Sequence, residues 1–537
     1  MTYRRLDLEA NRFAQALVSL GLQPGQRVML LLPNLPQTVI AFFGILKAGG
    51  VVVLPPPGSQ PDELARLLMD SSALMVIALT DQRSLVRTML SDARQNIPSA
   101  DLPAEAGITT PHQVIWCEPT EYLPGLTKFL FSLQSLIKPS QKTNLTSQEA
   151  TPTWLEQEEY LFRRLLKEHP SLRPQVPSSS KDLAVIAYTG GTTADAKGVM
   201  LSHSNLVANA LQTRAWISDA REGRERFLCA LPFLHSYGLM TSLITPVAMG
   251  ATMILKPRFD VANILQTIQR FKPTLFPGVP RMYLAINDFP AVRKYGIQSI
   301  RACLSGSAPL PVEVQETFEK LTKGRLVEGY GLTEASPVTH ANPLNDVRKV
   351  GSIGVPLPST EAKLVDLLHG RETVAVGQIG ELAIRGPQVM MGYWANPAAT
   401  RQAISPDGWL YTGDVAQMDE EGYFRIIARK TDMWYSSRAD NEEAPAFPRD
   451  VEEVLYEIPQ VKEATVVAIA GQPIAFIIAR GERPSSEAVI GYARRRLPPE
   501  LAPRLVIFLD EFPRSFIGKV LRRELARHLE YYGKETH

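Results

Sequence analysis

The chain has 537 residues, of which 45% are hydrophobic and 21% charged, a balance typical of globular proteins and not of disordered ones. Its length predicts more than one domain. The 57 Lys and Arg residues nearly balance the 55 Asp and Glu residues, so a net charge of +2 gives no general attraction to nucleic acid. The three cysteines are far apart in the sequence, which excludes a disulfide framework and a CxxC zinc site.

Short apolar runs alternate with helical patterns along most of the chain. Strands that are apolar throughout are typical of parallel sheets covered by helices on both faces. The pattern therefore predicts an α/β protein with parallel-rich sheets. We expect strands at 27–32, 51–54, 183–188, 251–255 and 302–305, and helices that include 37–48 and 204–212.

A less regular stretch, 111–181, ends in a run rich in proline and serine and is interpreted as a loop or linker. Within it, several apolar residues between 126 and 137 fall on one helical face, flanked by Lys128 and Lys138. We interpret this segment as a surface helix packed on its own domain. The alternative left open is a helix that lies on a membrane surface.

The segment 227–255 contains no Asp, Glu, Lys or Arg, as a membrane-spanning helix would. Two prolines and two glycines interrupt it, and its longest proline-free run, 233–245, has 13 residues. A spanning helix needs roughly 20. The segment therefore predicts a buried strand, loop, helix and strand, and not a transmembrane helix.

The pattern changes near residue 428, where a β-rich stretch ends and a compact α+β pattern begins. We expect helices near 451–457 and 487–497 and strands near 464–470 and 474–479. A large N-terminal domain at 1–428 and a small C-terminal domain at 429–537 follow from this change.

The most specific motif lies between the strand at 183–188 and the helix at 204–212. It consists of Thr189, Gly190, Gly191, Thr192, Thr193 and Lys197. Small residues let the backbone approach an anion, hydroxyl and N–H groups donate to it, and a lysine adds charge. The motif predicts a phosphate-binding loop. It is not a Walker A loop, because Ala196 and Gly198 stand where that loop has glycine and serine or threonine.

Four further blocks follow in order: EGYGLTE at 328–334, YTGD at 411–414, IARK at 427–430 and IGK at 517–519. Together with the phosphate loop, these blocks resemble those of the AMP-forming acyl-CoA synthetases of the adenylate-forming enzyme superfamily in sequence, order and spacing. The blocks LPFLHSYG at 231–238, GVPRMY at 278–283 and LSGSAPL at 304–310 resemble the bacterial long-chain fatty acyl-CoA ligases. This resemblance implies a large adenylation domain and a small, mobile C-terminal domain that carries a catalytic lysine.

The resemblance also implies a reaction in two steps. A fatty carboxylate attacks the α-phosphorus of ATP and gives acyl-AMP and pyrophosphate, and the thiol of coenzyme A then takes the acyl group. Lys519 would bridge the carboxylate and the α-phosphate, Thr333 would contact the α-phosphate, and Glu334 would hold Mg²⁺. The implied ATP-binding residues are Thr189, Gly190, Gly191, Thr192, Thr193, Lys197, Ser307, Ala308, Pro309, Glu328, Gly329, Tyr330, Gly331, Thr333, Asp414, Arg429 and Lys519.

Within that set, Asp414 would accept from both ribose hydroxyls with Arg429 as its helper, and Tyr330 would offer an aromatic face to adenine. His235 is implied as a catalytic residue near the carboxylate, and Thr431 as the hinge. The implied acyl pocket comprises His235, Tyr237, Gly238, Gly278 and Val279. For Tyr330 and His235, a purely structural role in the core is the alternative.

Two regions depart from the family pattern. Ala194 and Ala196 stand where relatives usually have glycine and proline in the phosphate loop. Thr431 replaces a usual Asp or Lys, and the following loop, 433–448, lacks glycine and is several residues longer. The adenylation machinery is nearly complete, whereas the machinery for the coenzyme A step is altered. The alternatives are an acyl-AMP ligase or a homologue impaired in that step, and a non-catalytic acyl- or nucleotide-binding protein.

The expected partners are therefore a fatty acid, ATP and coenzyme A, without nucleic acid. The scattered cysteines and the absence of an apolar run behind residues 1–5 predict a cytoplasmic protein. Peripheral contact with the inner face of the membrane is left open, as is the choice between monomer and homodimer.

Overall fold

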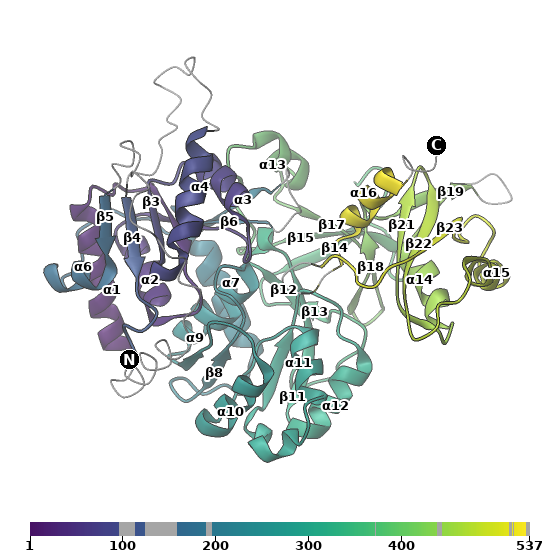
Figure 1. The fold of residues 1–537 in the computed structure, drawn as a ribbon, viewed down its shortest axis with the longest axis horizontal. Coiled ribbons are helices and arrows are strands. Elements are labelled where there is room, and N and C mark those ends of the chain that lie inside the picture. The colour runs from purple at the N-terminus through teal and green to yellow at the C-terminus, as the bar shows by residue number, and fades with distance from the viewer. Residues whose placement is uncertain are drawn as a thin grey trace, which may run out of the picture.

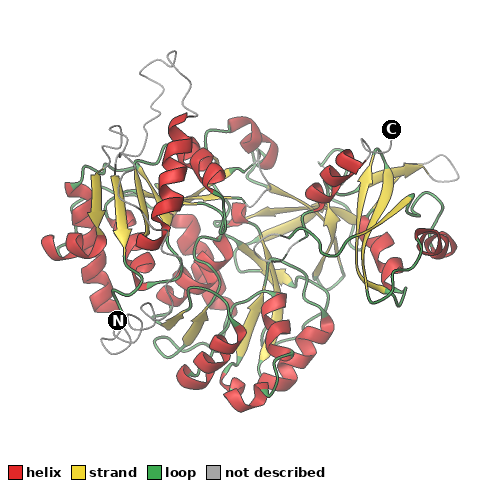
Figure 2. Cartoon of the chain, viewed as in Figure 1, coloured by secondary structure: helices red, strands yellow, loops and turns green. Residues whose placement is uncertain are grey.

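The computed structural model describes residues 1–95, 113–123, 158–189, 196–370, 372–437, 443–514, 518 and 520–532. Figure 1 shows a large lobe built from the N-terminal part of the chain and a smaller, C-terminal lobe beside it. Helices and strands alternate in the large lobe, whereas the small lobe combines a sheet with a few helices (Figure 2). The predicted fold class is confirmed.

The largest sheet has eight strands in the order β16-β7-β6-β2-β1-β3-β4-β5. Neighbours are parallel from β6 to β5, and β7 and β16 are antiparallel additions at one edge. The strands are β1 (Arg27–Leu31), β2 (Val51–Leu54), β3 (Met75–Leu79), β4 (Gln113–Cys117), β5 (Glu158–Leu161), β6 (Leu183–Tyr188), β7 (Gly198–Ser202) and β16 (Gly392–Tyr393). The strands predicted at 27–32, 51–54 and 183–188 are confirmed.

Helices cover both faces of this sheet, which explains why its inner strands β1, β2, β3 and β6 are almost entirely apolar. Val28 and Leu30 of β1 belong to the same core as Phe13 of the first helix. Met29 of the same strand faces the opposite core, which contains Leu64. The covering helices are α1 (Tyr3–Ser19), α2 (Pro36–Lys47) and α6 (Phe162–Glu168) on one side, and α3 (Pro61–Ser71) and α4 (Arg83–Gln95) on the other.

The uncharged segment forms a strand, a run of helical turns and a second strand, as predicted: β8 (Arg226–Cys229), α8 (Ser236–Gly238), the π-helix η3 (Leu239–Ile244), α9 (Thr245–Ala248) and β9 (Thr252–Leu255). No helix in the described parts of the chain is long and apolar enough to cross a membrane. Around it lie α7 (His203–Trp216), α10 (Val261–Phe271), α11 (Pro280–Asn287) and α12 (Val312–Thr322), with the strands β10 (Ala302–Ser305), β11 (Arg325–Gly331), β12 (Val338–Ala341) and β13 (Val355–Pro356).

A third sheet lies between the two lobes in Figure 1. Its antiparallel strands are β14 (Glu361–Val365), β15 (Ile379–Arg385), β17 (Leu410–Met418) and β18 (Phe424–Arg429), with α13 (Pro397–Ala403) before β17. The predicted domain boundary falls at the end of β18. Short 3₁₀ turns occur at η1 (Thr80–Gln82), η4 (Val292–Tyr295), η5 (Ile297–Ser299) and η6 (Thr333–Ala335).

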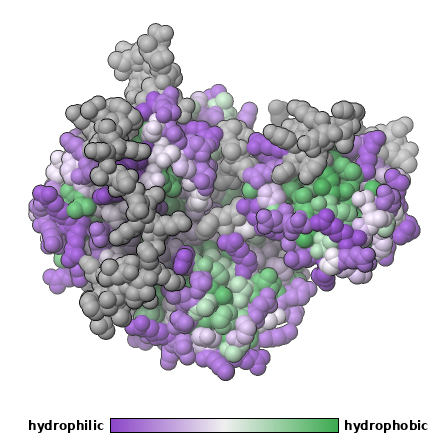
Figure 3. Space-filling model, viewed as in Figure 1, coloured by the Kyte–Doolittle hydropathy of each residue, from purple (hydrophilic) through white to green (hydrophobic). Residues whose placement is uncertain are grey.

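The small lobe contains the hairpin β19 (Trp434–Ser437) and β20 (Glu443–Ala446), and a sheet of β21 (Val461–Ile469), β22 (Gln472–Ala479) and β23 (Leu505–Phe508). Its helices are α14 (Pro448–Tyr456), α15 (Ser486–Arg496) and α16 (Arg522–Tyr532). The helices and strands predicted here are confirmed. Figure 3 shows two separate apolar areas on the viewed face, one on each lobe.

Some predicted features lie outside the described residues. These are the surface helix at 126–137, the loop residues Gly190, Gly191, Thr192 and Thr193, and Lys519.

Candidate functional site

Asp414 is the centre of a polar cluster between β11, β17 and β18. The residue is only 3% exposed, and its carboxylate accepts a hydrogen bond from the hydroxyl of Tyr330. Arg429 stands opposite Asp414 in the strand register, and its Nε lies 3.0 Å from Asp414 Oδ1. Burial acts to lower the pKa of Arg429, but Asp414 and its other anionic neighbours outweigh it, so the pKa is raised and the guanidinium stays charged. Three residues predicted to bind ATP thus meet.

The strand β11 approaches its neighbours closely at two predicted glycines. A Cβ atom on Gly331 would overlap the backbone of Pro337, and one on Gly329 would overlap Leu304. Position 331 therefore requires glycine, whereas a side chain at 329 would have to displace the end of the Leu304 side chain. Glu328, at the start of this motif, is partly buried, and burial raises its pKa to about 7 despite the opposing effect of a backbone N–H at Leu310 and of Arg449.

Ser307, Ala308 and Pro309 follow β10 in a loop before α12. Ser307 has a left-handed backbone with φ of 70°. Ser307 and Ala308 are partly buried and Pro309 is exposed.

A second cluster joins the base of the phosphate loop to Glu334. The N–H of Thr189 donates to the carbonyl of Lys197 at 3.1 Å, and the N–H of Lys197 donates to Thr189 Oγ1 at 3.2 Å. Lys197 Nζ lies 5.0 Å from the centre of the Tyr393 ring, and the Tyr393 hydroxyl donates to Glu334 Oε1 at 2.8 Å. Thr333 Oγ1 lies 3.0 Å from Ser236 Oγ.

Tyr393 is a residue that the sequence reasoning missed. It reaches the cluster because β16 pairs with β7, with Tyr393 opposite Val199. A two-residue strand leaves almost no periodic signal. The neighbouring Gly392 was a hint in the sequence that the backbone is unusual here. The structure gives Gly392 a φ of 143°, a value that favours glycine.

The residues around Glu334 fit a magnesium ion bound together with a nucleotide. No group of three or more His, Cys, Asp or Glu side chains in the described residues could hold a metal by itself. Mg²⁺ commonly takes one or two carboxylates and completes its shell with water and substrate phosphates. Glu334 can supply the one carboxylate for such an ion, and it lies near Lys197 of the predicted phosphate loop.

His235 and its neighbours lie at the start of the helical turns after β8. Burial lowers the pKa of His235 to about 4, and its Nδ1 accepts from the backbone N–H of Tyr237 at 3.2 Å, so the imidazole is neutral at physiological pH. The Tyr237 hydroxyl and the Gly278 N–H donate to the same carbonyl, that of Leu304, at 2.6 and 3.0 Å. A Cβ atom on Gly238 would overlap the Pro232 carbonyl.

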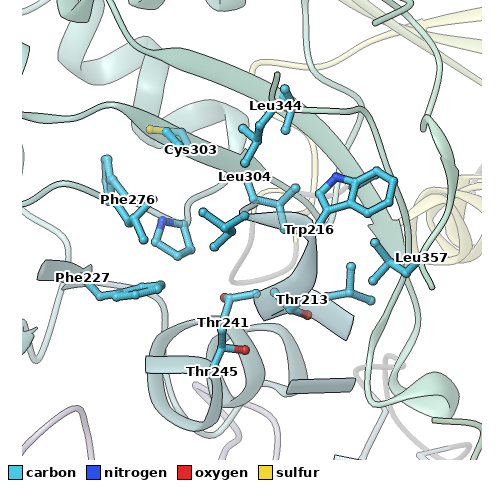
Figure 4. A pocket seen from close by; sticks show the side chains of 17 residues that line it. Thr213, Trp216, Phe227, Thr241, Thr245, Phe276, Cys303, Leu304, Leu344 and Leu357 are labelled. Atoms are coloured by element: carbon cyan, nitrogen blue, oxygen red, sulfur yellow. The ribbon is translucent and has the colours of Figure 1, made fainter. Parts of the chain in front are cut away.

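An apolar cavity of about 40 Å³ lies beside these residues (Figure 4). Its walls come from α7, the π-helix, β8, β10, β11 and β12. His235, Tyr237, Gly238, Gly278 and Val279 are not among the lining residues. Tyr237 and Gly278 instead hold Leu304, whose side chain lines the cavity. Val279 is buried at the beginning of α11.

The predicted hinge lies just after β18. Thr431 is exposed, and the next residue, Asp432, lies 3.7 Å from the Nε of Arg522 in the small lobe. The small lobe also reaches the large one at Gly518, where an added Cβ would stand 3.2 Å from the side chain of Arg281. The residue next to Lys519 in sequence therefore lies against the segment that carries Gly278 and Val279.

Comparison with known proteins extends over both lobes. The family model described as AMP-binding enzyme matches residues 1–394, and that described as AMP-binding enzyme C-terminal domain matches 450–519. A long-chain-fatty-acid–CoA ligase from Bacillus subtilis (strain 168) is 39% identical over 98% of this chain and 89% of its own length. One from Escherichia coli O157:H7 is 34% identical over 98% and 89%.

Solved structures resemble the whole chain as well. ATP-bound MatB from Rhodopseudomonas palustris is 25% identical and matches with a TM-score of 0.79 over 97% of this chain and 92% of that one. A fatty acyl CoA synthetase from Mycobacterium tuberculosis is 26% identical and matches with a TM-score of 0.72 over 98% and 92%.

Proposed function

The chain belongs to the AMP-binding enzyme family, and from this premise we propose that it is an AMP-forming fatty acid–coenzyme A ligase. It activates a long-chain carboxylic acid with ATP to acyl-AMP and pyrophosphate, and then transfers the acyl group to coenzyme A. The names of its relatives support the substrate class.

The observation that carries this proposal is the continuity of the two polar clusters. Arg429 pairs with Asp414 and also acts electrostatically on Glu334 and Tyr393. Asp414, which we assign to the ribose, therefore lies close enough to the group of Lys197 and Glu334, which we assign to the phosphates, for both to interact with Arg429 or its neighbours. A nucleoside triphosphate has a ribose diol at one end and a chain of phosphates at the other, and such a molecule fits this arrangement.

Each residue then has a defined task. Asp414 accepts from the ribose hydroxyls, Tyr330 contacts the adenine, and Lys197 and the loop hydroxyls hold the outer phosphates. Glu334 would hold Mg²⁺, which supplies positive charge to neutralise the phosphates when it is bound. Thr333, held beside Ser236, contacts the α-phosphate.

The remaining catalytic residues must reduce the repulsion between two anions, the fatty carboxylate and the α-phosphate of ATP. The carboxylate of the acid must reach the charged α-phosphate, so oriented donors and positive charge are required there. Lys519 supplies that charge from the small lobe, and Thr431 is the hinge on which the lobe turns. His235, neutral because of its burial, borders the carboxylate end of the acyl site without adding charge.

The apolar cavity is the part of the large lobe that we assign to the acyl chain. Phe227, Leu275 and Phe276 are among its lining residues and offer only apolar surface. Peripheral membrane contact through residues 126–137 stays the alternative to a helix packed on its own domain, since that segment lies outside the described residues.

Pyrophosphate release with hexadecanoic acid, measured with and without coenzyme A, tests the proposal. A ligase releases pyrophosphate and forms a thioester when coenzyme A is present. Pyrophosphate and acyl-AMP without thioester would identify an acyl-AMP ligase. Absence of both from a protein that still binds ATP would identify a non-catalytic binding protein and overturn the proposal.

A further inference from the structure

Two hydroxyl groups in the apolar cavity have no hydrogen-bond partner among the described residues. Thr213 on α7 and Thr245 at the start of α9 both line it, and they are 6% and 0% exposed. Among the described residues, neither Oγ1 atom has a donor or acceptor within reach. A buried hydroxyl without a partner costs free energy, and such groups are few in folded proteins. Ser242, Ser299 and Ser305 also have buried hydroxyls without a partner among the described residues, but they do not line this cavity. The observation to be explained is that Thr213 and Thr245 share one apolar cavity.

A third threonine in the cavity, Thr241, does have a hydrogen-bond partner, so the missing partners are particular to Thr213 and Thr245. Thr241, on the π-helix between the other two in Figure 4, donates to the carbonyl of Tyr237 at 2.7 Å. A threonine in a helix ordinarily bonds to the carbonyl four residues earlier in this way. Thr241 is therefore satisfied by its own helix and has no need of a ligand.

The π-helix explains why Thr245 differs. Residues 239–244 have the wider π-helical turn, in which backbone bonds connect residues five apart. Thr245 follows directly, so the carbonyl to which its hydroxyl would bond in an α-helix is displaced. Single π-helical turns are frequent at functional sites. The local distortion and the unpartnered hydroxyl thus occur together at the wall of the cavity.

We propose that Thr213 and Thr245 bind a hydroxyl group carried on the acyl chain, so that the preferred substrates are long-chain hydroxy acids. This inference rests on the proposed function and names the substrate class more narrowly. A chain hydroxyl can donate to one threonine and accept from the other. An unsubstituted alkyl chain would fill the cavity and leave both threonines unpartnered. The alternative occupant is water, for which the cavity has room.

The test is the adenylation step alone, measured as ATP–pyrophosphate exchange, with hexadecanoic acid and a series of its monohydroxy isomers. We expect kcat/KM to peak for one hydroxyl position, about 5- to 10-fold above hexadecanoic acid. Thr213→Val and Thr245→Val keep the side-chain shape and remove the hydroxyl. Each should lower the ratio of kcat/KM for the best isomer to that for hexadecanoic acid by about 3- to 10-fold.

Thr241→Val is the matched control, because it removes a hydroxyl from the same wall that is already bonded. It should leave the ratio at the wild-type value. Titration calorimetry of the same acids into each variant supplies a second readout that needs no turnover, and thermal unfolding shows that each variant is folded.

The outcomes separate this inference from the function on which it rests. If every isomer is used no better than hexadecanoic acid, or if neither valine variant changes the ratio, water fills the cavity and the inference is overturned while the ligase function stands. If no fatty acid of either kind supports exchange, the proposed function fails and the inference fails with it.

Discussion

At the scale of single residues, Asp414 interacts with two other residues of the proposed nucleotide site. It accepts from Tyr330 and pairs with Arg429 at 3.0 Å. Asp414→Ala should weaken ATP binding by about 10- to 100-fold, because hydrogen bonds to charged groups contribute more than neutral ones. Titration calorimetry measures this. Asp419→Ala, which removes an exposed partner of Lys349 beyond the same strand, should leave ATP affinity unchanged; equal affinity in both variants would contradict the ribose role of Asp414.

Tyr393 positions Glu334 and provides a second test at this scale. Tyr393→Phe keeps the ring below Lys197 and removes only the hydrogen bond to Glu334. We expect the freed carboxylate to hold Mg²⁺ less firmly, so that pyrophosphate release needs about 3- to 10-fold more Mg²⁺ for half-maximal rate. A magnesium titration identical to that of the wild type would show that Tyr393 does not position Glu334.

Glu328 gives a prediction about pH. Burial raises its pKa to about 7 from an ordinary value of 4.5. Between these two values the folded protein binds more protons than the unfolded one, so the free energy of unfolding falls as pH rises and levels off above 7. Glu328→Gln cannot ionise. Its melting temperature should exceed that of the wild type increasingly from pH 5 to pH 8, whereas parallel curves would contradict the raised pKa.

At the scale of elements, the strands of the large lobe were predictable because both of their faces are buried. An uninterrupted apolar run such as Leu183–Tyr188 lacks the polar face of an amphipathic helix and therefore indicates a buried strand. The uncharged segment was also resolved correctly, since prolines limit its helical length. The phosphate loop and the YTGD block were recognisable because their chemistry is local in the sequence.

Other features depend on contacts between distant segments and leave no local signal. The pair of Tyr393 with Glu334 requires the pairing of a two-residue strand, and the cavity is assembled from α7, the π-helix and strands up to β12. The five predicted acyl-pocket residues lie beside that cavity and not on its surface. The backbone hydrogen bonds of a π-helix span one residue more than those of an α-helix, and an apolar pattern such as Leu239–Ile244 does not reveal this difference.

The loop before α16 permits a test of the catalytic lysine. Its neighbour Gly518 lies close to Arg281 of the large lobe, since a Cβ atom added there would stand 3.2 Å from that side chain. Lys519→Ala should abolish acyl-AMP formation while ATP binding persists, because one positive charge is removed from the transition state and not from the nucleotide site. Single-turnover acyl-AMP formation and ATP titration measure the two effects. Lys462→Ala, an exposed lysine on β21, is the control; equal turnover in both variants would exclude the role of Lys519.

At the scale of the whole molecule, the proposed rotation of the small lobe would govern the second half-reaction. The longer segment after Thr431 forms the hairpin of β19 and β20, with Trp434 paired with Ala446. Trp434 is 6% exposed and belongs to the core of the small lobe together with Val451 and Leu455. The hairpin therefore packs as part of that lobe, and the proposed pivot would lie among the few residues between Arg429 and Trp434.

The identity of the residue at this proposed pivot, Thr431, leads us to expect slow transfer of the acyl group to coenzyme A. Thr431 is exposed, its β-branched side chain is stiff at χ1, and it has no charge to exchange between partners as the lobe rotates. We therefore expect adenylation to be faster than thioester formation, with acyl-AMP accumulating when coenzyme A is limiting. Rapid-quench measurement of both steps with hexadecanoic acid determines the two rates. Thr431→Asp should speed thioester formation without changing the rate of pyrophosphate release. Thioester that appears as fast as pyrophosphate in the wild type, with no acyl-AMP lag, would show that the altered pivot and hairpin leave the second step unimpaired.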